Sequence, residues 1–147
     1  MAQGGQRREQ QGKFLMPPCV VDTDVVSFLF KNSGLASLYH QHVTGKLLLI
    51  SFMTVAELDR WALQHNWGPA RTALMEAHLQ QFVVHPSDRD LSRLWARVID
   101  GERRNGRVIS TADAWIAATA LLNNIPLVSH NRRDFEKIAG LNLISEA

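Results

Sequence analysis

The sequence predicts an α/β fold in which helices cover both faces of a mainly parallel central sheet. Three observations support this prediction. Short apolar runs alternate with helical patterns along the chain, as they do in βαβ units. A continuous apolar run extends from Lys46 to Ile50, which is typical of a strand covered on both faces. The length of 147 residues suits one domain, because most domains contain about 100–150 residues.

Each element is predicted from its own local pattern. Strands are expected at short apolar or β-branched runs, namely at residues 19–21, 46–50, 82–84, 126–129 and 141–144. Helices are expected where apolar residues recur at helical spacing, namely at residues 25–30, 35–43, 51–62, 69–81, 87–99, 111–122 and 132–138. Ser51 or Thr54 marks the start of the third helix. The spacing of Ser87 and Asp90 predicts Ser87 as the N-cap of the fifth helix.

The beginning of the chain differs in composition from the rest. It is rich in Gln and Gly and nearly free of apolar residues, so it cannot offset the entropy lost on ordering. We therefore expect residues 1–16 to form a disordered tail and residues 17–147 to form a single domain.

Composition excludes several classes of protein. No stretch approaches the ~20 consecutive apolar residues of a membrane span, so an integral membrane protein is not expected. Cys19 is the only cysteine, which excludes an internal disulfide framework and favours a cytoplasmic location. The net charge of +2 resides in the first 15 residues, since the remaining residues carry 13 basic and 13 acidic side chains. Net charge therefore does not predict that the domain binds nucleic acid.

Acidic residues follow the first predicted strand or lie near the start of predicted helices. Asp22 and Asp24 come directly after the first strand. Glu57 lies in an apolar stretch of the third helix, and Asp113 lies in the first turn of the sixth. Acids that converge at the carboxyl edge of a sheet repel one another unless a cation intervenes, and oxygen ligands suit Mg²⁺ or Mn²⁺. The pattern predicts a metal site, whereas helix capping is the alternative for each acid taken alone.

Four segments resemble the motif blocks of PIN-domain nucleases. They are Val20–Ser27 (VVDTDVVS), Ser51–Leu58 (SFMTVAEL), Ala112–Leu121 (ADAWIAATAL) and Leu127–Phe135 (LVSHNRRDF), in the order and spacing of that family. The sequence resembles in particular the VapC-type toxins of bacterial toxin–antitoxin pairs, over residues 18–145. The resemblance implies a PIN-like three-layer α/β/α sandwich and a ribonuclease that uses Mg²⁺, with Mn²⁺ as a possible substitute.

The resemblance also assigns roles to individual residues. Asp22, Glu57 and Asp113 match the three core acids of the family and are expected to be catalytic metal ligands. Asn131 stands where many members have a fourth carboxylate, and is expected to bind the ion directly or through water. Other polar side chains are expected to orient these ligands, with helix capping as the alternative for the hydroxyls: Thr23, Asp24, Thr54 and Ser129.

Basic residues near the last block offer contacts for RNA. Arg132 and Arg133 flank the predicted site, and His130 lies beside them, so all three are candidates for substrate binding. A second basic stripe lies on the fifth helix, where pairing with nearby acids is the favoured interpretation: Arg89, Arg93 and Arg97.

The four tryptophans fall mostly at helical apolar spacing, and we expect core packing rather than base stacking.

Two other functions fit parts of the sequence. The run from Asp22 to Val26 also matches the start of haloacid-dehalogenase-like phosphatases, with Asp22 as nucleophile, although the chain lacks their acidic D-D pair. A catalytically silent PIN-like module that binds RNA or protein is the second alternative.

As a VapC-like toxin, the chain would act on RNA, form a homodimer and bind a small cognate antitoxin.

Overall fold

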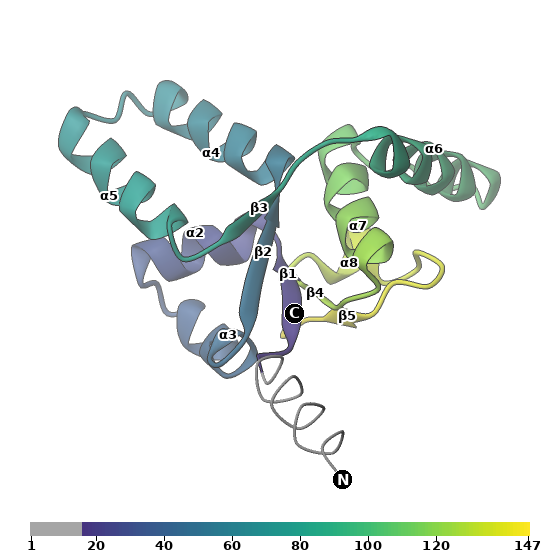
Figure 1. Ribbon diagram of the computed structural model, residues 1–147, viewed down its shortest axis with the longest axis horizontal. Helices are drawn as coiled ribbons and strands as arrows, with labels where there is room; N and C mark the ends of the chain where they lie inside the picture. Colours follow the sequence, from purple (N-terminus) through teal and green to yellow (C-terminus); the bar gives the residue numbers. More distant parts are fainter. Residues whose placement is uncertain (1–15) are drawn as a thin grey trace, which may run out of the picture.

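The computed structural model describes residues 16–147, so the tail predicted for residues 1–16 lies outside the described part except for Met16. The five strands are β1 (Pro18–Val21), β2 (Leu47–Ser51), β3 (Val83–His85), β4 (Leu127–Val128) and β5 (Leu143–Ile144). The seven helices are α2 (Thr23–Lys31), α3 (Ala36–Val43), α4 (Phe52–Gln64), α5 (Pro69–Leu79), α6 (Arg89–Arg104), α7 (Thr111–Asn123) and α8 (Arg132–Phe135). Figure 1 shows the strands at the centre of the molecule, with helices α2–α5 on one side and helices α6–α8 on the other.

The strands form one sheet in the order β3-β2-β1-β4-β5, and all four pairings are parallel. This confirms the predicted α/β class. The chain builds the sheet outward from β1 on one side, through β2 to β3, and then returns to place β4 on the other side of β1. The strand order therefore reverses at β1, and the carboxyl ends of β1 and β4 border the crevice in which such sheets bind ligands.

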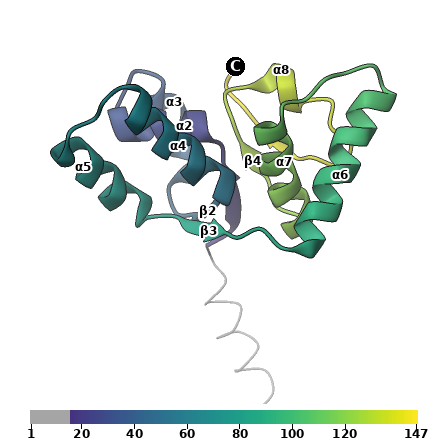
Figure 2. The same cartoon turned by 90° about the horizontal axis from the view of Figure 1, so that it is seen from above.

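Alternate residues of the strands pack into two separate cores, because successive side chains of a strand point to opposite faces of the sheet. Val21, Ile50 and Val128 belong to the core beneath α2, α3, α4 and α5. Val20 and Leu127 belong to the core beneath α6, α7 and α8. Figure 2 shows these two helical groups on either side of the strands, which is the predicted three-layer sandwich.

Two predicted helix starts are settled by their capping contacts. Ser51 is the N-cap of α4, since its hydroxyl accepts a hydrogen bond from the Met53 backbone N–H. The prediction of Ser87 as the N-cap of α6 is wrong. Asp88 occupies that position, and its carboxylate accepts a 2.8 Å hydrogen bond from the Leu91 backbone N–H. Because the carboxylate of Asp88, one residue after Ser87, binds a free N–H group of the first turn, α6 begins at Arg89 and therefore later than predicted.

Across residues 16–147, no helix combines the length and the apolar character needed to cross a bilayer.

Candidate active site

A pocket of about 360 Å³ lies at the carboxyl edge of the sheet. Its wall contains all three predicted core acids together with other polar side chains and one tryptophan, namely Asp22, Thr23, Asp24, Glu57, Trp61, Asp113, His130 and Asn131. We call this cavity the acid pocket. Thr54 and Ser129 are fully buried and lie behind the wall.

Asp22 joins β1 to α2 at the floor of the acid pocket. Its backbone N–H donates to the Val128 carbonyl of β4, and its side chain caps α2 by accepting from the Thr23 backbone N–H at 2.7 Å. The Ser129 hydroxyl donates to the second carboxylate oxygen at 2.6 Å. Burial raises the pKa of Asp22 well above its usual value, and the neighbouring charge of Asp24 raises it further. Asp22 therefore both caps α2 and lines the acid pocket.

Glu57 faces the pocket from the second turn of α4. The Thr23 hydroxyl donates to its carboxylate at 2.7 Å, and the same hydroxyl lies 3.0 Å from the hydroxyl of Thr54. These contacts connect the start of α2 to α4. Of the hydroxyls predicted to orient the ligands, those of Thr23 and Ser129 contact an acid directly. The hydroxyl of Thr54 contacts Glu57 only through Thr23.

Asp113 enters the pocket from the first turn of α7. Ser110 is the N-cap of this helix and accepts a 3.1 Å hydrogen bond from the Asp113 backbone N–H. Burial raises the pKa of Asp113 to about 6. The charges of Asp134, Glu57 and Asp24 contribute to this rise, so the carboxylates at this edge of the sheet repel one another.

The loop after β4 completes the wall. Asp24 holds it to α2, because one carboxylate oxygen accepts from the Val25 N–H and the other from the His130 N–H. Burial raises the pKa of Asp24. The Asn131 side-chain amide donates to Asp134 at 2.7 Å, and its backbone N–H donates to Ser129.

His130 is held by a buried phenol. Its Nδ1 atom lies 2.6 Å from the hydroxyl of Tyr39, and that hydroxyl accepts a hydrogen bond from the Glu146 backbone N–H. The phenol can donate to Nδ1 or accept from it, according to the tautomer of the ring. The contact fixes the direction of the imidazole in either case.

The two arginines predicted to bind substrate lie outside the pocket wall and differ from one another. Arg132 donates to the backbone carbonyls of Ser145 and Ala147 at 2.9 Å and 2.8 Å, so it fastens the end of the chain to α8. Arg133 is exposed on the same helix.

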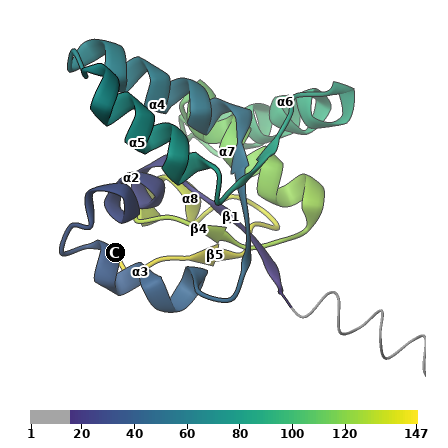
Figure 3. The same cartoon turned by 60° about the vertical axis from the view of Figure 1, so that its left-hand side comes forward.

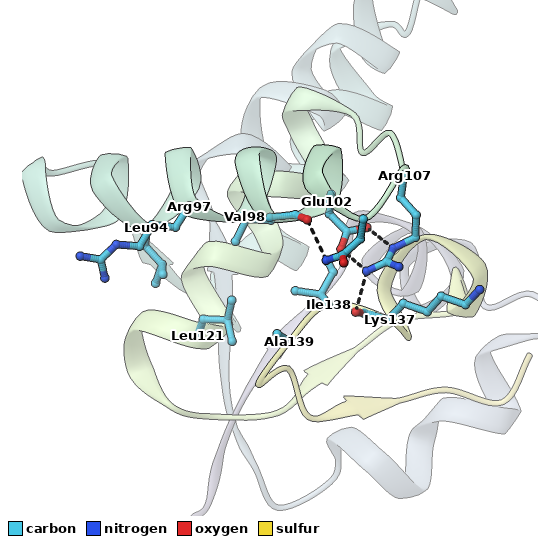
Figure 4. Close-up of a pocket in the computed structure, with 11 residues that line it drawn as sticks. Leu94, Arg97, Val98, Glu102, Arg107, Leu121, Lys137, Ile138 and Ala139 are labelled. Atoms are coloured by element: carbon cyan, nitrogen blue, oxygen red, sulfur yellow. Dashed lines mark hydrogen bonds and ion pairs between the residues drawn. The ribbon is translucent and has the colours of Figure 1, made fainter.

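The other arginines of interest lie on or after α6. Arg93 forms a 3.8 Å ion pair with Asp90, whereas within residues 16–147 neither Arg89 nor Arg97 forms one. Arg107, just beyond α6, pairs with buried Glu102 through two hydrogen bonds of 2.9 Å and 3.0 Å. Figure 4 shows this pair in a separate pocket between α6 and the segment after α8.

Comparison with known proteins identifies the fold. A family model described as PIN domain matches residues 19–141. The chain belongs to the PIN-domain family. This membership agrees with the four motif blocks in the sequence and replaces the haloacid-dehalogenase-like alternative.

Its PIN-domain relatives cover nearly the same length of chain. The VapC ribonuclease Y4jK of Sinorhizobium fredii (strain NBRC 101917 / NGR234) is 33% identical over 137 residues, which are 86% of this chain and 95% of the relative. Ribonuclease VapC1 of Haemophilus influenzae (strain R2866) is 29% identical over 127 residues, which are 83% and 92% of the two chains.

Solved structures agree with this assignment. The structure of VapBC2 from Rickettsia felis, bound to a DNA fragment from their promoter, superposes with a TM-score of 0.77 at 17% identity, covering 87% of this chain and 98% of that one. VapBC-1 from nontypeable Haemophilus influenzae gives a TM-score of 0.74 at 25% identity, covering 87% and 97%. The predicted PIN-like fold is therefore confirmed.

The donor set of this PIN domain suits a hard cation, since every acid in the pocket presents oxygen and their mutual repulsion favours a positive charge between them. Across residues 16–147, however, no three His, Cys, Asp or Glu side chains converge closely enough to ligate one ion together. Mg²⁺ commonly keeps several of its waters and uses few direct protein ligands. A wide acidic pocket is compatible with that mode of binding.

Three residues near the site were not predicted from the sequence to lie there. Trp61 lies four positions after Glu57, and this spacing places both on one helix face, so the pattern could have indicated it. Ser110 precedes a predicted helix start and could have been recognised as an N-cap. Tyr39 has no such local pattern, because its partner His130 is 91 residues away.

Proposed function

We propose that this chain is a metal-dependent ribonuclease, and that it acts as the toxin of a toxin–antitoxin pair. The observation that carries the proposal is the acid pocket, in which Asp22, Glu57 and Asp113 come from three separate elements and line one cavity. Within residues 16–147, no Lys or Arg forms an ion pair with any of the three. The VapC ribonucleases that the chain resembles support the same activity.

The cation that suits this pocket is Mg²⁺, with Mn²⁺ as a substitute. Asp22, Glu57 and Asp113 would hold it, partly through water, and we propose a single firmly held ion. Asn131 would add a neutral oxygen, because its amide nitrogen already donates to Asp134. When bound, the ion would neutralise charge at a phosphate and lower the pKa of a water that it coordinates.

The other side chains keep the acids in place and contact the substrate. The hydroxyls of Thr23 and Ser129 donate to Glu57 and Asp22, which fixes the direction of both carboxylates. His130 is proposed to donate a hydrogen bond from Nε2 to the RNA backbone. Arg132 and Arg133 are proposed to add positive charge where the strand leaves the pocket.

Assembly is part of the same proposal. The structural neighbours include a toxin–antitoxin complex from Klebsiella pneumoniae and a member of the VapBC family of toxin–antitoxin systems from Mycobacterium tuberculosis, which supports a small antitoxin protein as the cognate partner of this chain. We also propose a homodimer, and a cytoplasmic location where cellular RNA is available as substrate.

Cleavage of RNA by the purified full chain tests the proposal. Transfer RNA and messenger RNA are incubated with the protein in Mg²⁺, in Mn²⁺ or in EDTA. Cleavage is expected with either metal, and no cleavage is expected in EDTA. Growth arrest on expression, relieved by the neighbouring small reading frame, is the expected result for a toxin with its antitoxin.

Two variants make the test specific to the acid pocket. Asp22→Asn and Asp113→Asn are each expected to abolish metal-dependent cleavage, while Asp100→Asn on the exposed face of α6 keeps the wild-type rate. Wild-type cleavage by Asp22→Asn or Asp113→Asn would overturn the proposed site. Binding of RNA without cleavage in Mn²⁺ would instead favour the silent binding module.

A further inference from the structure

Beyond the acid pocket, a strip of aromatic and basic side chains crosses the surface formed by α2, α4 and α5. Figure 3 shows α4 and α5 side by side on this part of the molecule, as Figure 1 does. A hollow of about 260 Å³ is lined by Lys31, Trp61, His65, Trp67 and Arg71. A second hollow of about 580 Å³ is lined by Phe30, Lys31, Arg71, Leu74, Ala77, His78 and Gln81. We call the two hollows together the aromatic–basic strip.

The strip is continuous with the acid pocket. Trp61 lines both the acid pocket and the first hollow, and Lys31 and Arg71 line both hollows. The three cavities therefore follow one another across the surface, with a tryptophan at the first boundary and two cations at the second. A linear ligand that extends from the acid pocket into the strip would therefore pass Trp61.

The cations of the strip are stacked on its rings. The Lys31 ammonium lies 5.3 Å from the centre of the Trp61 ring, and the Arg71 guanidinium lies 4.6 Å from that of Trp67 and 5.7 Å from that of Phe30. Within residues 16–147, neither Lys31 nor Arg71 forms an ion pair with a carboxylate. Both side chains are exposed, so their charge is held in place by the rings and remains available to a ligand.

The charge of the strip is opposite to that of the acid pocket. Neither hollow has an Asp or Glu in its wall, whereas the acid pocket has four. A polyanion would therefore be repelled at the acids without a metal ion, but attracted at the strip with or without one. Rings interleaved with basic groups are the surface chemistry that holds single-stranded nucleic acid, because bases stack on the rings while phosphates meet the cations.

We propose that the aromatic–basic strip binds the unpaired RNA strand on one side of the bond that is cleaved. The inference rests on the proposed function for the position of the cleaved bond, but not for RNA binding itself. Trp61 separates the cleaved nucleotide from its neighbours, and Trp67 with Arg71 holds the nucleotides beyond it. The strip would thus set the preference for single-stranded over double-stranded RNA.

Binding measured without cleavage tests this inference. The full chain in EDTA is titrated against fluorescein-labelled 12-nucleotide poly(U) and poly(A), with fluorescence anisotropy as the readout. The double variant Lys31→Glu/Arg71→Glu is expected to bind at least about 10-fold more weakly than the wild type. The slope of log affinity against log salt is expected to fall by about 1.4, which is two phosphate contacts at about 0.7 each for a single strand.

A matched control separates the strip from the effect of total charge. Arg89→Glu/Arg97→Glu on α6 makes the same change in net charge on another exposed surface, and it is expected to change affinity less than about threefold. Trp67→Ala is expected to weaken poly(A) binding by roughly 5-fold or more through lost stacking, and Trp67→Phe to restore most of it. A 12-base-pair RNA duplex is expected to bind more weakly than either single strand.

The outcomes distinguish this inference from the proposed function. Equal affinities for the wild type and Lys31→Glu/Arg71→Glu overturn the strip as an RNA site, even if RNA is cleaved. Equal binding of duplex and single strand overturns the stacking role of Trp67. If the strip variants lose RNA binding while the wild type cleaves nothing in Mg²⁺ or Mn²⁺, the strip stands and the proposed ribonuclease activity fails.

Discussion

Two pockets of this molecule each contain a buried carboxylate, and the charged side chains around the two carboxylates are of opposite sign. Asp22 in the acid pocket is 5% exposed, and Glu102 in the pocket beside α6 is 6% exposed. Glu102 receives two hydrogen bonds from the Arg107 guanidinium, which also donates to the Lys137 carbonyl. Asp22 receives one hydrogen bond from a hydroxyl and one from a backbone N–H, and the neighbouring charges that raise its pKa are those of two other acids, Asp24 and Asp113.

The difference supports the proposal that Asp22 is functional, whereas Glu102 is structural. A buried charge is costly unless it is paired, and the chain supplies that pair for Glu102. For Asp22, Glu57 and Asp113 the chain supplies further negative charge instead. A folded protein that concentrates unpaired acids in one cavity gives up stability there, which is expected where a cation from solution completes the site.

The largest expected effect is on activity. Asp22→Asn should lower metal-dependent RNA cleavage by at least about 100-fold, because the amide is a weaker ligand and removes the negative charge that attracts the ion. Its melting temperature in EDTA should equal or exceed that of the wild type, since the substitution removes repulsion with Asp24. Cleavage assays and thermal unfolding of the same preparation give both values. A large drop in melting temperature would mean that Asp22 is structural, like Glu102.

In the pocket beside α6, a substitution is expected to lower stability and to leave activity nearly unchanged. Arg107→Met leaves Glu102 buried without its partner, and the melting temperature should fall by about 5 °C or more. The rate of RNA cleavage at 20 °C should stay within about twofold of the wild type. Glu102→Gln/Arg107→Met removes both charges and should recover part of the lost stability. If Arg107→Met also abolished cleavage in the folded protein, the two pockets would not be independent.

The contrast between the two pockets was only partly accessible from the sequence. Asp22, Glu57 and Asp113 were predicted because each lies next to the carboxyl end of a strand or in an early helical turn, which are local features of the chain. The strip was not predicted, because Trp61 and Trp67 occur at spacing that core packing explains equally well. Both do pack against the core beneath α2–α5, yet both remain partly exposed on a surface that also carries basic residues.

Contacts between distant residues explain the remaining differences. Arg132 remains a candidate for contact with RNA, but the sequence does not indicate that the last residues return to α8 and accept its hydrogen bonds. The same applies to Tyr39 and His130, which only the folded chain brings together. The wrong prediction of Ser87 as the N-cap of α6 has a local cause. Both Ser and Asp cap helices, so only the backbone conformation decides that Asp88 takes this position.

A smaller effect is expected from the hydroxyl that supports Glu57. Thr23→Val removes the 2.7 Å hydrogen bond to the carboxylate, and should weaken Mn²⁺ binding by about 10-fold while leaving the fold intact. Thr23→Ser keeps the donor and should restore most of the affinity. Calorimetric titration of Mn²⁺ into the three proteins measures the effect. Equal affinities for wild type and Thr23→Val would show that Glu57 needs no support from α2.

The smallest expected effect is on the pH dependence of stability without metal. Burial raises the pKa of Asp113 to about 6 from 3.8, so the folded protein binds that proton more tightly than the unfolded chain. The stability from this group is complete below about pH 4 and is lost as pH rises through about 6. In EDTA the wild type should therefore lose a few degrees of melting temperature between pH 4 and 7 relative to Asp113→Asn, whereas Asp100→Asn should follow the wild type. Saturating Mn²⁺ should reverse the sign, because the ion binds the deprotonated carboxylates, and the same slope with and without Mn²⁺ would mean that Asp113 does not bind the ion.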